Sequence, residues 1–210
     1  MDQSLATLQW TQLQQTKAKL EAHQFEVDLV SDRQACRERI AAMLKEKISV
    51  SVGGSMTLAE CGIMELLESS TQIRYLDRYH CEDPDLIFHQ ALSCDLYLTS
   101  SNAVTMDGKL VNVDGNGNRV AAMIYGPKKV VVIAGVNKLV RDEQQALQRI
   151  QTLAAPANCV RLNKENPCIR IGYCVDCQQP GRICSAAVTL HRSHVPGRIH
   201  VILVNEALGY

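Results

Sequence analysis

The sequence has few aromatic residues and no excess of either charge. Phe, Trp and Tyr together make up 4% of the 210 residues, and 22 Lys and Arg balance 22 Asp and Glu. Proteins that bind nucleic acids rely on clustered basic side chains to neutralise phosphates and often on aromatic rings that stack on bases. The chain has no basic run, so we expect no nucleic acid among its partners.

Long apolar runs are also lacking. A membrane-spanning helix needs about eighteen consecutive apolar residues, and no segment approaches that length. Residues 1–21 are polar and rich in glutamine, unlike the apolar centre of a secretory signal peptide. We therefore expect a cytoplasmic protein with no membrane partner.

Cysteine, in contrast, is abundant, with nine in the chain. Stable disulfides are rare in the cytoplasm, so clustered cysteines there favour metal ligation or redox chemistry. Four cysteines follow the spacing Cys168-x5-Cys174-x2-Cys177-x6-Cys184. Two glycines and a proline in the same segment let the backbone turn sharply, so the four thiols can surround one ion or cluster.

This spacing predicts a metal site in the loop 168–184. Soft thiolates select zinc or an iron–sulfur cluster over calcium or magnesium. Ribbon-type zinc sites usually carry two Cys-x-x-Cys pairs, whereas this loop has one, so the spacing favours a cluster, [4Fe–4S], with zinc as the alternative. Free cysteines can also pack as small apolar residues. We expect that packing role for most of the other five cysteines: Cys36, Cys61, Cys81, Cys94 and Cys159.

Strand and helix signals alternate along the chain. The β-branched segment 48–52, the segment 96–99 and the apolar run 130–134 are typical of strands, the last two of buried ones, and residues 103–113 indicate a hairpin around an Asp-Gly turn. This order predicts an α/β fold with an open, mostly parallel sheet and an inserted antiparallel hairpin. We expect one domain over residues 1–210, because the cysteine-bearing tail is too short to form a core of its own.

Several helix boundaries can also be predicted. Residues 31–34 and 57–60 each fit a capping box, in which two side chains satisfy the first amides of a helix. The second of these helices would continue to residue 67 along one apolar face. A further helix, capped by Asp142, is expected to end near Pro156, where the helical pattern dissolves into the cysteine-bearing loop.

Polar loops follow three of the predicted strands, at residues 53–57, 100–102 and 135–138. In open α/β sheets, ligands bind where strand ends give way to loops and helix N-termini, and the backbone amides there favour anions. The alternatives are a tight turn before a capped helix and a solvated loop lysine. The predicted contacts to a small anion are Gly53, Gly54, Ser55, Thr57, Asn102, Asn137 and Lys138.

Three charged residues complete the candidate site. Glu60 follows the glycine-rich loop and could act as a catalytic nucleophile or general base, although its place in a capping box explains it equally without chemistry. Asp114 and Arg119 flank a turn of the hairpin region and are predicted to contact the ligand. The alternative for Asp114 is a turn role, since Asp-Gly is first of all a turn signal.

A set of segments, taken together, resembles the LUD domain of lactate-utilisation proteins. They are residues 51–63, 101–108, 113–120, 126–127, 134–138, and the tail from 182–184 to 206–210. The resemblance covers nearly the whole chain in order. It implies a fold similar to the NagB/RpiA/CoA-transferase group and a role, with partner proteins, in lactate oxidation. The four-cysteine tail is similar to that of one branch of the family, and Glu60 lies where a glutamate serves as acyl acceptor in enzymes of the wider fold.

The leading hypothesis is a metabolic protein that serves redox chemistry of a small organic acid of the lactate type. The anion would be held at the strand ends, and an electron-transfer partner would be required because the chain has no flavin or nicotinamide fingerprint. A homo-oligomer is a further possibility. The alternatives are a non-catalytic ligand-binding or scaffold subunit with a structural zinc, and an acyl-transfer or sugar-phosphate enzyme that uses Glu60.

Overall fold

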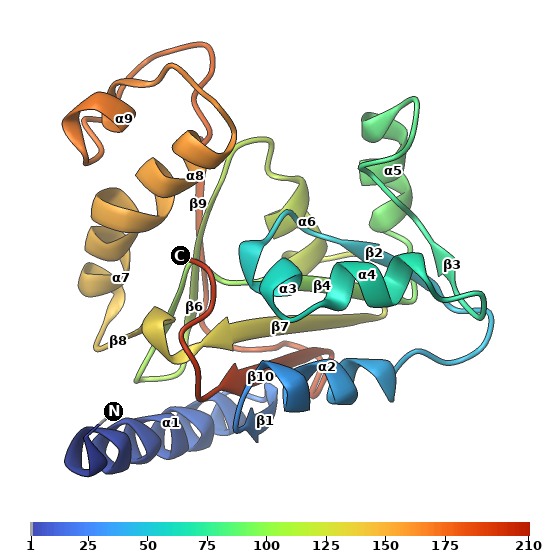
Figure 1. Ribbon diagram of the computed structural model, residues 1–210, viewed down its shortest axis with the longest axis horizontal. Helices are drawn as coiled ribbons and strands as arrows, with labels where there is room; N and C mark the ends of the chain where they lie inside the picture. Colours follow the sequence, from blue (N-terminus) through green and yellow to red (C-terminus); the bar gives the residue numbers. More distant parts are fainter. Residues whose placement is uncertain (1) are drawn as a thin grey trace.

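A computed structural model describes residues 2–210 and contains two β-sheets. The larger sheet has six strands in the order β1-β10-β7-β4-β2-β3, and every neighbouring pair is parallel. Its strands are β1 (Glu26–Val30), β2 (Ser49–Val52), β3 (Arg74–Tyr75), β4 (Leu96–Ser100), β7 (Lys129–Gly135) and β10 (Ile199–Val204). The prediction of an α/β fold with a mostly parallel sheet is confirmed (Figure 1).

The smaller sheet contains the predicted hairpin. Strands β5 (Ala103–Thr105) and β6 (Leu110–Asp114) are antiparallel, as expected from the Asp-Gly turn between them. Two short strands from later in the chain extend this hairpin to four strands. β8 (Leu139–Val140) runs parallel to β5, and β9 (Ala186–Leu190) runs antiparallel to β6.

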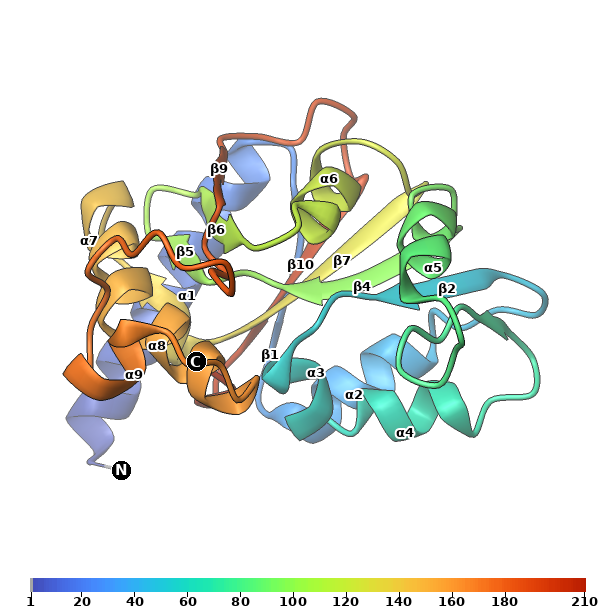
Figure 2. The same cartoon turned by 90° about the horizontal axis from the view of Figure 1, so that it is seen from above.

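Helices cover both faces of the parallel sheet, and each face has its own apolar core. Helices α2 (Arg33–Ala41), α3 (Met56–Glu60) and α4 (Ile63–Glu68) pack on one face. Helices α1 (Gln3–Ala22), α5 (Pro84–Ala91) and α6 (Asn118–Ile124) pack on the other, together with the smaller sheet. Figure 2 shows α2, α3 and α4 on the side opposite α5, α6 and β6.

Strand β7 shows how one sequence run supplies both cores. Val130, Val132 and Ala134 point into one core, whereas Val131 and Ile133 point into the other. Side chains alternate between the two faces of a strand, so a strand buried on both faces needs a continuous apolar run. This explains why residues 130–134 could be recognised as a central strand.

The helix that follows Asp142 is longer than expected. It comprises α7 (Glu143–Arg149), one turn of π-helix at Ile150–Ala154, and α8 (Ala155–Arg161). Pro156 has no N–H and cannot make the regular helical hydrogen bond. The π turn directly before it changes the hydrogen-bond pattern locally, so the helix continues past the proline. The prediction that the helical pattern ends near Pro156 was therefore wrong. A short helix, α9 (Pro167–Ile171), leads into the cysteine-bearing loop.

Both predicted capping boxes were also wrong in detail. The N-cap of α2 is Asp32, and the N-cap of α3 is Ser55, whose hydroxyl accepts the Leu58 N–H at 3.3 Å. The predicted helix from residue 57 to 67 is divided into α3 and α4. Gly62, which has a left-handed φ of +64°, lies between them and turns the chain.

None of the helices within residues 2–210 combines the length and the apolar content that a membrane crossing requires.

Candidate functional site

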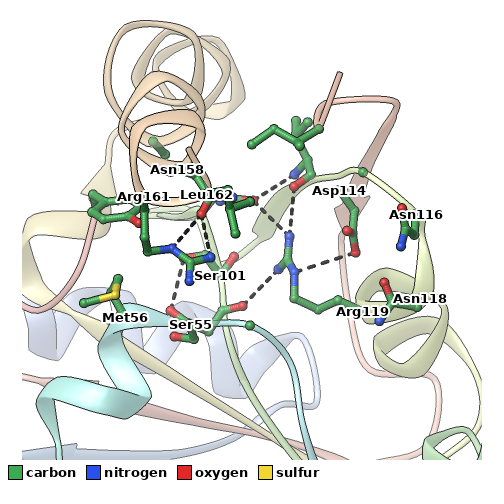
Figure 3. Close-up of a pocket in the computed structure, with 18 of the residues that line it drawn as sticks. Ser55, Met56, Ser101, Asp114, Asn116, Asn118, Arg119, Asn158, Arg161 and Leu162 are labelled. Carbon is green, nitrogen blue, oxygen red and sulfur yellow. Dashed lines mark hydrogen bonds and ion pairs between the residues drawn. The ribbon is translucent and has the colours of Figure 1, made fainter. Parts of the chain in front are cut away.

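A cavity of about 210 Å³ opens at the carboxyl edge of the parallel sheet. Strands β2 and β4 are neighbours, as are β4 and β7, and all three are parallel, so their carboxyl ends meet at this edge. The loops after these strands line the cavity, together with the β6–α6 turn and the C-terminal end of α8 (Figure 3). This is the place where ligands bind in open α/β sheets.

The cavity is strongly cationic. Four basic side chains line it, from Arg78, Arg119, Lys138 and Arg161, against one carboxylate, Asp114, among the lining residues that the structure describes. Arg119 and Arg161 reach toward the centre from opposite sides in Figure 3. An excess of positive charge in a partly enclosed space attracts anions and raises their local concentration.

Arg119 is held rigidly by the loops around it. One terminal nitrogen donates to the Ser100 carbonyl at 3.0 Å, and the other donates to Asn102 Oδ1 at 3.1 Å. Asp114 lies 3.7 Å from its Nε. Burial lowers the pKa of Arg119, whereas the nearby Asp114 opposes this shift. The guanidinium still stays charged, because arginine is not deprotonated in proteins.

Gly53 makes this placement of Arg119 possible. A Cβ atom at residue 53 would lie 2.7 Å from Thr99 Oγ1 and 3.1 Å from Arg119 Cδ. Any larger residue would therefore clash with Thr99 and crowd the side chain of Arg119. Gly53 was predicted to contact the ligand, but it does not line the cavity and instead supports its cationic floor.

Lys138 lies at the end of β7, where a turn of 3-10 helix spans Val136–Lys138. Its side chain lines the cavity and is only 3% exposed, and Nζ donates to Ser100 Oγ at 3.0 Å. Burial lowers the pKa of Lys138 to about 7, and repulsion from Arg149 and Arg119 adds to the effect. The amine is therefore partly uncharged at neutral pH.

Thr57 and Glu60, which were predicted to belong to the site, lie behind the cavity and hold the C-terminal segment, residues 208–210. The Thr57 hydroxyl donates to the Leu208 carbonyl at 3.2 Å, and Glu60 Oε2 accepts the Gly209 N–H at 2.7 Å. Neither residue lines the cavity. The Glu60 carboxylate thus has a backbone partner of its own, which is a different role from the helix cap that the sequence suggested.

Asn137 holds the same segment from the other side. Its Oδ1 accepts the Leu208 N–H at 3.0 Å, and its Nδ2 donates to the Gly209 carbonyl at 2.8 Å. Residue 210 then lines the cavity. Asn137 was predicted to contact the anion directly, whereas the structure gives it a positioning role. The remaining predicted contacts line the cavity: Gly54, Ser55, Asn102, Asp114, Arg119 and Lys138.

The four cysteines of the predicted metal site lie in and beside the loop after α9. Cys174, Cys177 and Cys184 are half-buried, and Cys168 is buried on α9. Burial raises the pKa of the Cys184 thiol, and the proximity of Cys174 and Cys177 adds to this rise. Those three thiols therefore share one region of the loop.

Cys168 contacts a fifth cysteine. Burial, together with a hydrogen bond to Cys168, raises the pKa of Cys159 to about 12. Core packing was expected for most of the five cysteines outside the loop, and Cys159 is buried. Within residues 2–210, no three of the cysteine sulfurs lie within 4.8 Å of one another. The metal role of the loop stays a prediction.

The cysteine loop borders the cationic cavity at one residue, Ile183. Strand β9 directly follows the loop and pairs with β6, and the Ser185 N–H donates to the Asp114 carbonyl at 2.8 Å. Ile183, the neighbour of Cys184, lines the cavity, and a Cβ at Gly115 would lie 3.3 Å from its Cα. The two candidate sites that the sequence indicated separately are therefore adjacent in the fold.

The sequence matches the LUD domain family over residues 13–204. The chain belongs to the LUD-domain family.

A solved structure supports the fold of this LUD domain. The crystal structure of a DUF162 family protein from Deinococcus radiodurans is similar to it at 15% sequence identity, with a TM-score of 0.55, and the match covers 94% of this chain and 98% of that chain. The β subunit of eIF2B from Chaetomium thermophilum is 15% identical with a TM-score of 0.32, covering 64% and 44% of the two chains, a likeness too slight to carry an argument. None of the curated proteins matches the sequence significantly.

Two basic residues of the LUD-domain cavity were missed from the sequence. Arg161 lies at the end of α8 and donates to Asn158 Oδ1, one helical turn earlier, at 2.8 Å. Extending the helix past Pro156 would have placed these two residues on one face. Arg78 lies in the loop between β3 and α5, with its guanidinium 4.5 Å from the centre of the Phe88 ring, and no local pattern marked it.

The LUD-domain cavity can bind a small anion and can hold a partly neutral amine beside it. Carboxylates suit it, because guanidinium groups donate paired hydrogen bonds to their two oxygens.

Proposed function

We propose that this LUD domain binds the anion of a small organic acid of the lactate type in the cationic cavity. It would serve the oxidation or reduction of that acid with an iron–sulfur cluster held by Cys168, Cys174, Cys177 and Cys184. The observation that carries the proposal is that the cysteine loop borders the cavity through Ile183, the neighbour of Cys184.

The character of the cavity supports an acid rather than a neutral ligand. Four basic side chains face one carboxylate, and a volume of about 210 Å³ suits a molecule of a few carbon atoms. Polar groups next to the cations, such as Ser55 and Asn102, can bind a hydroxyl or carbonyl group on the same molecule. A 2-hydroxy acid has both the anionic group and the polar group.

The chemistry of the cysteine loop fits an iron–sulfur cluster. The Asp176 N–H donates to Cys174 Sγ at 3.4 Å, the kind of bond that stabilises a metal-bound thiolate. Asp176 has a left-handed φ of +50°, so the Cys-x-x-Cys turn is tight. The Arg182 guanidinium donates to the Cys177 carbonyl at 2.8 Å and so brings a positive charge beside the thiols.

The cysteine spacing along the chain favours a cluster over zinc, because ribbon-type zinc sites usually carry two Cys-x-x-Cys pairs and this loop has one. Bound there, a cluster would supply one-electron transfer next to the cavity.

A partner protein would complete the function. Conversion of a 2-hydroxy acid to a 2-oxo acid releases two protons and two electrons, and the electrons need an acceptor. The sequence has no dinucleotide fingerprint, so we propose an electron-transfer partner. The competing acyl-transfer function receives no support, because Glu60 is hydrogen-bonded to Gly209 and does not line the cavity.

The metal proposal is tested by anaerobic purification, iron and sulfide analysis, and a visible spectrum. Cys174→Ala and Cys177→Ala should each lose iron, sulfide and the visible absorbance. Cys81→Ala is the matched control, because Cys81 is also half-buried but lies outside the loop. One zinc per chain and no colour would replace the redox role with a structural one, and the absence of both metals would refute the metal site.

The anion proposal is tested by calorimetric titration with lactate and with pyruvate at low salt. Arg78→Ala and Arg161→Ala should each weaken binding several-fold, and added salt should weaken it further because the attraction is electrostatic. Arg141→Ala is the control, since that side chain is 75% exposed and does not line the cavity. Equal binding by all three variants would contradict the proposed site.

A further inference from the structure

Among residues 2–210, Lys138 is the lysine that the fold buries, and it is one of the residues that line the cationic cavity. We propose that Lys138 forms a covalent imine with the carbonyl group of a small 2-oxo acid bound in this cavity. This inference rests on the proposed function for its anion site, and it names both the class of the bound acid and the group that reacts with it.

The surroundings of Lys138 leave its amine available. Nζ has one side-chain partner, Ser100 Oγ at 3.0 Å, and no carboxylate of the described residues lies within ion-pair distance. A Cβ at Gly209 would lie 3.5 Å from Nζ, so the glycine leaves room beside the amine. A lysine that is buried without a counter-ion is costly unless it becomes neutral.

Charged groups from three helices act on the amine. Arg149 on α7 and Arg119 on α6 repel the ammonium form, whereas Glu60 and Cys61 at the end of α3 favour it more weakly. Burial, together with repulsion from the two arginines, lowers the pKa of Lys138 to about 7. About half of the Lys138 side chains then carry a free amine at pH 7, against about one in 3,000 for an ordinary lysine. Desolvation and a neighbouring cation are the usual means by which proteins activate a lysine as a nucleophile.

The carboxylate of the acid has its own partners. Arg78 lines the cavity and, in residues 2–210, stacks on the Tyr79 and Phe88 rings without donating a side-chain hydrogen bond. Its N–H groups are therefore free to bind a carboxylate. With a guanidinium holding the negative charge, Lys138 is not needed as the counter-ion and can stay neutral.

The reaction balances without an oxidant or a reductant. The Lys138 nitrogen attacks the carbonyl carbon, a C–N bond forms, and the carbonyl oxygen takes up a proton to give a carbinolamine. The C–O bond then breaks, and the oxygen leaves as water with the two hydrogens that the amine has lost. Ser100 Oγ, hydrogen-bonded to Nζ, is placed to relay a proton between nitrogen and oxygen.

The test uses the full chain, pyruvate as the probe and sodium cyanoborohydride to trap an imine by reduction. Peptide mass spectrometry should find the reduced adduct on Lys138, formed at least about tenfold faster than on Lys45, which is exposed. Lactate has the same charge as pyruvate but no keto group. It should therefore compete for the anion site and slow the labelling by pyruvate, and it should give no adduct itself. Lys138→Met should lose this adduct, and Lys45→Met should keep it.

Calorimetry on the same samples separates the two proposals. Pyruvate binding without an adduct on Lys138, or adducts spread evenly over the lysines, would overturn the imine and leave the anion site intact. If neither pyruvate nor lactate binds, both the imine and the anion site are refuted. Retention of pyruvate binding by Lys138→Met, with loss of the adduct, would show that the variant folds and that the amine is the reacting group.

Discussion

Replacing Lys138 by methionine should make the protein more stable. Lys138 is 3% exposed, and burial beside two arginines lowers its pKa from 10.5 to about 7. Between about pH 7 and pH 10.5, Lys138 is therefore neutral in the folded chain and charged in the unfolded chain. Burial of Lys138 lowers the free energy of unfolding by its full amount below pH 7, and this loss shrinks as the pH rises from 7 to 10.5. Methionine has a similar shape and removes this loss altogether.

The size of the effect follows from the pKa shift. Each pKa unit corresponds to about 1.36 kcal/mol, and at pH 7 the shift of Lys138 costs about 4 kcal/mol of the free energy of unfolding. The variant also loses the hydrogen bond to Ser100, worth about 1 kcal/mol. The net gain is about 3 kcal/mol at pH 7, or roughly 6 to 12 °C in Tm for a chain of this length.

Urea denaturation of both proteins at pH 6 and pH 9 measures this effect. The advantage of Lys138→Met should be about 4 kcal/mol at pH 6 and about 1 kcal/mol at pH 9. Lys45→Met, at an exposed position, is the control and should change stability little at either pH. A variant that is less stable than the wild type at pH 6, or a gain that does not depend on pH, would refute the reasoning.

Three further predictions concern other parts of the fold. Glu60→Ala should speed hydrogen exchange of the Gly209 amide, measured by NMR, whereas Glu60→Gln should preserve most of its protection because the amide oxygen still accepts; equal exchange in both variants would contradict the positioning role. Leu98→Ala, fully buried in β4, should lower the free energy of unfolding by about 2–5 kcal/mol in urea, and a loss below about 1 kcal/mol would count against the packed core. Gly53→Ala should displace Arg119 and weaken pyruvate binding in calorimetry, and unchanged affinity would show that this glycine is not required.

The central part of the fold could be predicted because its strands are buried on both faces and therefore consist mainly of apolar residues. Residues 48–52 and 96–99 are rich in Val, Ile and Leu, residues 130–134 are a continuous apolar run, and these segments form the neighbouring strands β2, β4 and β7. The boundaries around Pro156 could not be predicted in the same way. A proline normally ends a helix, and the π turn before it is stabilised by packing of Ile150 and Ala154 in the tertiary structure.

The candidate site was predictable to the extent that it depends on strand ends. Gly54, Asn102 and Lys138 follow parallel strands, and such ends must meet at one edge of the sheet. Arg78 and Arg161 could not be predicted, because they reach the cavity from a loop and a helix that no spacing connects to the strand ends.

The sequence by itself determined the α/β class, the polar strand ends and the four-cysteine spacing, because each depends on local order along the chain. Only the tertiary structure decided that Glu60 and Asn137 hold the C-terminal segment, and that the cysteine loop borders the cavity through Ile183. It also decided the environment of Lys138, whose pKa depends on burial and on arginines contributed by two different helices. Burial and charge at a site are sums over neighbours, and those neighbours come together only when the chain is folded.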